Sequence, residues 1–152
     1  MTNLTGLNET QRAAVLKTDG PMMILAGAGS GKTRTLVTKI SYLIEEKNIS
    51  THRLLALTFS NKAAKEMRER VSSTINVDAG ALQITTFHSF CARLLRSEAS
   101  YLGLSRNFTI YDTSESKSVV KAILARHGIS SKEISPYEVL YYIDHIKNLG
   151  HC

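Results

Sequence analysis

The stretch "MMILAGAGSGKTRTLV", from Met22 to Val37, combines an apolar run, a glycine-rich turn and the start of a helical pattern. Phosphate-binding loops of the pattern G-x-x-x-x-G-K-[ST] join a strand to a helix in the same way. The first position of the pattern is occupied by Ala26 instead of glycine. An alanine methyl group at the end of a strand need not obstruct a phosphate, so the stretch predicts a nucleotide site.

Each part of this loop has a physical task. Glycines leave the backbone N–H groups free to turn toward an anion, and the helix that follows presents its positive end. The Lys32 ammonium can reach the β and γ phosphates, and the Thr33 hydroxyl can bind Mg²⁺. We therefore expect Lys32 and Thr33 to be catalytic, Thr33 to be the metal ligand, and the phosphates to lie against Ala26, Gly27, Ala28, Gly29, Ser30 and Gly31.

Apolar runs and helical segments alternate over the first two thirds of the chain. The runs are short and lie at Met22–Ala26, Leu54–Phe59, Leu82–Phe87 and Phe108–Tyr111. Between Asn61 and Val71 a helical projection places the apolar side chains in one arc, which contains Ala63, Ala64, Met67 and Val71. This alternation predicts an α/β fold with a mainly parallel sheet flanked by helices.

The pattern changes after Asp112, where only helical signals follow. Val119, Val120, Ile123 and Leu124 mark a helix that Gly128 can end, and "SPYE" supplies Ser135 as N-cap, Pro136 at the first position and Glu138 for a capping box. We expect a first domain over residues 1–112 and the beginning of a helical subdomain, truncated, over residues 113–152. Asp112 could be an acidic strand-end ligand for a metal, but the pattern favours a helix N-cap.

Composition limits the class of protein. The 152 residues suit one core, and no apolar run approaches the roughly 18 residues that a transmembrane helix needs. The amino terminus lacks a secretory pattern, so we expect a soluble, cytoplasmic protein with no membrane partner. Cys91 and Cys152 are too far apart in sequence to indicate a metal-ligand pair. The net charge of +6 favours a polyanionic partner only weakly.

Three further stretches carry a resemblance to a known family. They are "LNETQRAAV" before the loop, and "LALTFSNKAAKEMRERV" and "TTFHSFCARLL" after it. Together with the loop, "NFTIYD" and "IKN", the chain resembles the UvrD/Rep/PcrA family of superfamily 1 DNA helicases over essentially its whole length. The resemblance implies a RecA-like P-loop NTPase fold, ATP and Mg²⁺ as ligands, and 3′-to-5′ movement on single-stranded DNA toward duplex junctions in repair or replication. Alanine is common at the first loop position in that family.

The resemblance also implies residue roles around the nucleotide. Gln11 matches the glutamine that reads the adenine edge, a task for which an amide is suited because it both donates and accepts. Its alternative role is local, since Asn8 as N-cap would place Gln11 at the third helical position of a capping box. Arg34 matches an arginine near the base, although an exposed helical arginine would look the same.

Two motifs imply contacts to single-stranded DNA. The first contains Thr58, Phe59, Asn61 and Lys62, and the second contains Thr86, Phe87 and His88. Phe59 could stack on a base. Taken without the resemblance, an aromatic residue at a strand end favours a buried position. We expect His88 to position a phosphate and to take no part in acid–base chemistry.

Several motifs of that family are absent from the 152 residues. They are the acidic strand with its catalytic glutamate, the arginines that reach the γ phosphate, and the second RecA-like domain. The resemblance therefore implies that Asp112 belongs to a structural turn, and that this chain is the amino-terminal part of an ATP hydrolase but does not turn over ATP by itself. The alternative is a self-standing nucleotide- or DNA-binding module. The sequence leaves the oligomeric state open.

Overall fold

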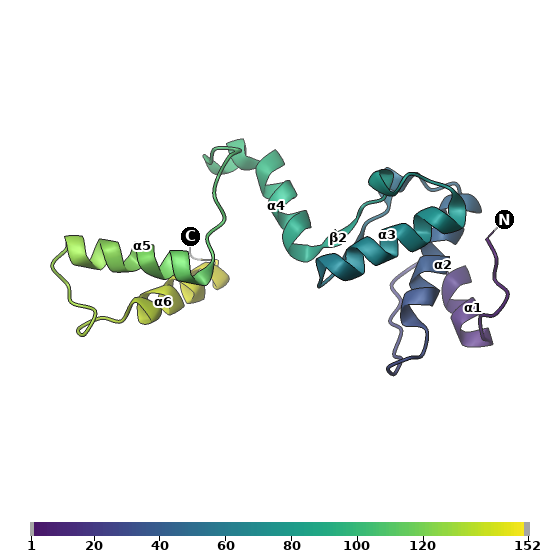
Figure 1. Ribbon diagram of the computed structural model, residues 1–152, viewed down its shortest axis with the longest axis horizontal. Coiled ribbons are helices and arrows are strands. Elements are labelled where there is room, and N and C mark those ends of the chain that lie inside the picture. Colours follow the sequence, from purple (N-terminus) through teal and green to yellow (C-terminus); the bar gives the residue numbers. More distant parts are fainter. Residues whose placement is uncertain (1, 151–152) are drawn as a thin grey trace. The chain divides into compact units, whose positions relative to one another are not determined.

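The computed structural model describes residues 2–150, which form two compact units that divide between Glu98 and Ala99. Figure 1 labels most of the elements. None of the helices in the described part is long and apolar enough to cross a membrane. The elements are α1 (Glu9–Leu16), α2 (Lys32–Glu45), η1 (Thr51–Arg53), β1 (Ala56–Thr58), α3 (Asn61–Ile75), η2 (Ala79–Ala81), β2 (Ile84–Thr86), α4 (Phe87–Ser97), η3 (Ala99–Leu102), α5 (Thr113–Arg126) and α6 (Pro136–Asn148).

The first unit contains a parallel pair of strands joined by a helical crossover. β1 pairs with β2 in a register that places Ala56 opposite Ile84 and Thr58 opposite Thr86. α3 makes the connection and packs against both strands, as a parallel pair requires. The predicted α/β class, the parallel pairing and the position of these two strands are confirmed, although each strand is shorter than the apolar run that contains it.

The core of this unit lies between α2, α3 and β2. The helical period brings the apolar side chains of each helix to one face, and α2 and α3 pack against each other. Three of the four residues of the predicted apolar arc of α3, Ala64, Met67 and Val71, are buried, and Ala63 is half-buried. The buried cluster consists of Val37, Ile40, Met67, Val71, Leu82 and Ile84.

Two of the four predicted strands are wrong. Met22–Ala26 and Phe108–Tyr111 have no strand assignment among the described residues. In the first of these segments Met23 is 83% exposed and Leu25 is 87% exposed. A strand is held by hydrogen bonds to a neighbour, and the described sheet consists of β1 and β2 alone. The apolar pattern of these runs therefore has no partner edge among the described residues.

The second unit is built from α5 and α6, which pack against each other (Figure 1). Asp112 caps α5: its carboxylate accepts from Glu115 N, and the Glu115 side chain accepts from Asp112 N. Ser135 and Glu138 form the same reciprocal arrangement at the start of α6, with proline in the first turn. Both predicted caps are confirmed. The carboxylate of Asp112 is thus used at a helix start, as the structural-turn interpretation requires.

Candidate functional site

The glycine-rich loop leads directly into α2. Gly31 is the N-cap of α2 and has a φ of 79°, a left-handed conformation that glycine adopts most readily. A Cβ atom on Gly31 would also lie 2.9 Å from the Gln11 side-chain nitrogen, so the Gln11 amide would have to move away from the loop. Ser30 N donates to Gly27 O across the turn at 3.3 Å. The sequence therefore forms a tight turn whose end is the positive end of α2.

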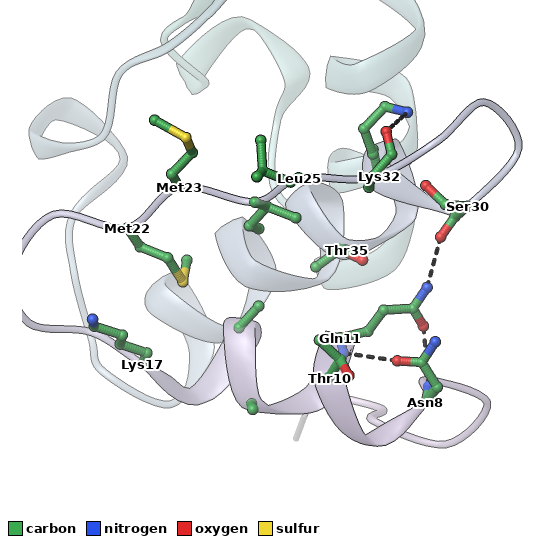
Figure 2. A pocket seen from close by; sticks show the side chains of 14 residues that line it. Asn8, Thr10, Gln11, Lys17, Met22, Met23, Leu25, Ser30, Lys32 and Thr35 are labelled. Atoms are coloured by element: carbon green, nitrogen blue, oxygen red, sulfur yellow. Dashed lines mark hydrogen bonds between the residues drawn. The ribbon is translucent and has the colours of Figure 1, made fainter.

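Lys32 folds back over this turn. Its Nζ donates to Ala26 O at 2.9 Å (Figure 2) and to Gly27 O at 2.6 Å. The side chain is exposed, so the ammonium can exchange these carbonyl oxygens for the oxygens of an anion without unfolding the loop. A lysine at this position is a flexible point charge suited to phosphate.

Gln11 lies at the start of α1 and faces the loop. Its Nε2 donates to Ser30 O at 2.9 Å, and its Oε1 accepts from Asn8 N at 3.0 Å. Asn8 in turn caps α1 by accepting from Gln11 N, so the predicted capping box is confirmed. A glutamine amide has two N–H donors and two acceptor lone pairs. One donor and one acceptor therefore remain, which is the pair that an adenine edge requires.

A cavity of about 490 Å³ connects these groups. Figure 2 shows Gln11 and Ser30 on one side of it and the extended segment with Met23 and Leu25 on another. The lining combines polar groups from α1 and the loop with an apolar wall, and consists of Asn8, Thr10, Gln11, Ala13, Ala14, Lys17, Met22, Met23, Ile24, Leu25, Ala26, Ser30, Lys32 and Thr35. Apolar walls with a few convergent polar groups are typical of small-molecule sites.

The fit to Mg²⁺ depends on Thr33. This exposed residue is the second residue of α2, next to Lys32, and the cavity lining contains no carboxylate. No group of three or more His, Cys, Asp or Glu side chains suited to a metal occurs among residues 2–150. Mg²⁺ commonly takes one or two protein oxygens and completes its shell with phosphate and water. The residues present therefore suit a metal that is bound together with a nucleotide.

Arg34 lies one residue beyond Thr33, and its contacts were not predicted. Its Nη2 donates to Thr5 O at 3.3 Å, which ties the segment before α1 to α2. Lys39, further along α2, donates to Ala14 O at 2.9 Å. Neither hydrogen bond can be predicted from residue types, because the acceptors are backbone carbonyls, which every residue carries. Burial lowers the pKa of Lys39, and the Lys17 ammonium lowers it further.

A second candidate site lies where β1 and β2 end. Because the strands are parallel and Thr58 pairs with Thr86, the residues that follow them meet at one edge of the sheet. Both strands lead at once into helices, α3 capped by Ser60 and α4 capped by Thr86. Two helix N-termini thus lie at the same edge, and each presents N–H groups suited to a phosphate.

Phe59 and Phe87 join the two motifs at this edge. Their ring centroids are 5.5 Å apart with an interplanar angle of 39°, within the range of favourable aromatic pairs. Phe59 is 92% exposed. The prediction of a buried strand-end aromatic, made from residue type alone, is wrong. The strand ends before Phe59, so its ring projects beyond the core and rests only partly on Phe87.

The other residues predicted to contact DNA differ in solvent exposure. Asn61 and Lys62 open α3 and are exposed, as is His88 near the start of α4. Thr58 is half-buried, whereas Thr86 is buried and its hydroxyl accepts from Ser89 N at 3.2 Å. The hydroxyl of Thr86 is therefore engaged in capping α4.

The comparisons with known proteins agree on one family. Residues 7–151 match the UvrD/REP helicase N-terminal domain. The chain is 47% identical to an ATP-dependent DNA helicase PcrA of Bacillus subtilis over 145 residues, which are 95% of this chain and 20% of that protein. It is 46% identical to ATP-dependent DNA helicase PcrA of Staphylococcus aureus, with the same coverage. The chain thus spans about a fifth of the length of these relatives. It belongs to the UvrD/Rep helicase family and corresponds to the N-terminal domain of that family.

Proposed function

We propose that this chain is the ATP-binding, amino-terminal part of a DNA helicase that moves 3′-to-5′ on single-stranded DNA. Two lines of support meet here. The relatives that it resembles over nearly all of its length are named ATP-dependent DNA helicases. The residues that would bind ATP and DNA lie in two separate clusters of the first unit, one around the loop and one at the strand ends.

The observation that carries the nucleotide half of this proposal is the hydrogen bond from Gln11 Nε2 to Ser30 O. It brings the adenine-reading candidate onto the wall of the same cavity as the loop. In the proposed complex the loop from Ala26 to Gly31 binds the phosphates, Lys32 contacts the β and γ oxygens, and the Thr33 hydroxyl binds Mg²⁺. Arg34 lies beside the base. When bound, Mg²⁺ neutralises phosphate charge.

The proposed binding of DNA is supported by the position of the two predicted DNA motifs, which lie at the same edge of the sheet. Phe59 offers an exposed ring to a base, with Phe87 beside it. Asn61, Lys62 and His88 offer polar atoms to the phosphates. Thr58 lies at the end of β1, and Thr86 caps α4. Stacking with few base-edge contacts gives binding that tolerates any sequence, as a translocating motor needs. We propose single-stranded DNA and duplex junctions as partners, in the cytoplasm, during repair or replication.

The exposed segment Met22–Ala26 also has a place in this proposal. Four consecutive apolar side chains in this segment, at Met22, Met23, Ile24 and Leu25, are exposed among the described residues. An exposed apolar run of this kind suits burial against another surface. We propose that the rest of a longer protein, with a RecA-like P-loop NTPase fold, covers it.

What the 152 residues do alone follows from the lining of the cavity. Phosphoryl transfer needs a carboxylate for the metal and a group that orients the attacking water, and no carboxylate is among the residues that line the cavity. Asp112 is used as the cap of α5. We propose that the chain binds Mg-ATP without cleaving it, and that the longer protein supplies the missing groups.

We expect steady-state ATP hydrolysis by the isolated chain to stay at the background rate, with or without saturating single-stranded DNA. The reason is that no carboxylate for the metal lines the cavity, and the measurement is phosphate release at an ATP concentration where binding is shown to be saturated. A sample with Lys32→Ala gives the background. Robust turnover that DNA stimulates and Lys32→Ala removes would show that the chain contains a complete catalytic site.

A further inference from the structure

Lys39 reaches across from α2 to the carboxyl end of α1. Its Nζ donates to Ala14 O at 2.9 Å and also to Lys17 O. α1 ends at Leu16, and Lys17 is its C-cap. One ammonium group from a neighbouring helix therefore binds two carbonyl oxygens in the last turn and cap of α1.

α1 is held against α2 by side-chain packing and by this ammonium. It has eight residues, and Val15 is its one buried residue; helices this short are marginal without tertiary packing. Its last turn contains no basic residue, so the carbonyl oxygens and negative dipole end there are not matched from within the helix. Burial and Lys17 both lower the pKa of Lys39, which means that the ammonium is held in a place that disfavours its charge. The ammonium nevertheless donates to two carbonyl oxygens in this place.

The other end of α1 carries Gln11. Its Nε2 donates to Ser30 O at 2.9 Å, which joins this end of α1 to the loop. Gln11 and Ala14 are three residues apart, which is about 4.5 Å along a helix axis. The Lys39 contact and the Gln11 amide therefore lie on the same short helix, less than one turn apart along its axis.

We propose that Lys39 is a positioning residue of the nucleotide site: by binding the carboxyl end of α1 to α2, it fixes where the Gln11 amide meets the adenine edge. The inference rests on the proposed function, because it takes Gln11 as the adenine contact. In this proposal Lys39 supports recognition of the base, whereas Lys32 binds the phosphates. Loss of Lys39 should then weaken binding of ATP more than binding of a phosphate chain without a base.

The experiment compares Mg-ATP with Mg-tripolyphosphate by calorimetry on the full chain. For Lys39→Met, which keeps the aliphatic stem and removes the donors, we expect ATP affinity to fall about fivefold, the effect of about one hydrogen bond, and tripolyphosphate affinity to stay unchanged. Lys39→Arg, which keeps a charged donor, should restore most of the ATP affinity. In Gln11→Ala the further change Lys39→Met should have no added effect. Lys65→Met, an exposed α3 lysine paired only weakly with Glu69, is the matched control.

Equal losses for both ligands, or losses that add in the double variant, would overturn the inference and make Lys39 a general stabiliser of the fold. Lys39→Gln is measured alongside in case Lys39→Met does not fold. It keeps a donor on a shorter stem and must show the same selective loss at a smaller size. If the unaltered chain binds ATP no better than tripolyphosphate, then Gln11 does not recognise adenine, and the proposed role of Lys39 is wrong with it. If it prefers ATP and Lys39→Met keeps that preference, only the role of Lys39 fails.

Discussion

Replacing Lys32 with alanine is expected to lower the affinity for Mg-ATP by about a hundredfold, because it removes charge-assisted hydrogen bonds to phosphate. The Lys32 ammonium lies at the turn, within hydrogen-bond distance of Ala26 O and Gly27 O. A phosphate oxygen bound by the glycine-rich loop would therefore lie close to this ammonium. Lys32 is the only lysine in the first turn of α2. Calorimetric titration of the chain with Mg-ATP measures the effect.

Lys47→Ala is the control for this change. Lys47 is exposed just beyond the far end of α2, and its Nζ lies 5.8 Å from the centre of the Tyr42 ring, away from the glycine loop in sequence. Its loss should leave ATP affinity within about twofold, because a distant exposed charge acts weakly in salt. Unchanged affinity in Lys32→Ala, with the thermal midpoint also unchanged, would contradict the assignment of the loop as the phosphate site.

Replacing Phe59 with alanine is expected to weaken binding of single-stranded DNA roughly fivefold to a hundredfold, the range for losing one base stack. The ring is 92% exposed and touches Phe87, so it contributes little to the core. Binding should fall while the thermal midpoint changes little. Fluorescence anisotropy with a labelled oligonucleotide at fixed, low salt measures the affinity.

Tyr101→Ala tests whether any exposed aromatic residue has the same effect. Tyr101 is 86% exposed and lies in η3 of the second unit, outside the predicted DNA motifs. Its removal should leave DNA affinity unchanged, and Phe59→Trp should keep most of it because the larger ring can still stack. DNA binding by Phe59→Ala that equals that of the unaltered chain would remove Phe59 from the interface.

The local elements could be predicted from sequence because their causes are local. The apolar arc of α3, the cap at Ser135 and the reciprocal pair of Asp112 and Glu115 each depend on residues within one or two helical turns. Gly31 could be placed at the end of the loop for the same reason. These patterns specify a helix and its boundaries without knowledge of the rest of the fold.

The remaining features depend on partners that the local pattern does not contain. Met22–Ala26 has the composition of a strand, yet a strand needs a neighbour, and the described sheet provides none beside it. Phe59 follows the end of β1 by one residue, a margin finer than sequence patterns resolve. The contacts of Lys39 and Arg34 end on backbone carbonyls, so no residue type marks them in the sequence.

The central claim is that ATP and single-stranded DNA bind this chain at two separate places, and amide chemical shifts of the isotope-labelled chain test it most directly. Mg-ATP should shift the amides of the loop and the start of α1 and α2, namely Gln11, Gly27, Ala28, Gly29, Ser30, Gly31, Lys32, Thr33 and Arg34. An oligonucleotide should instead shift those at the strand ends, namely Thr58, Phe59, Asn61, Lys62, Thr86, Phe87 and His88. Shifts from Mg-ATP that avoid the loop, or shifts from both ligands at the same residues, would contradict the account.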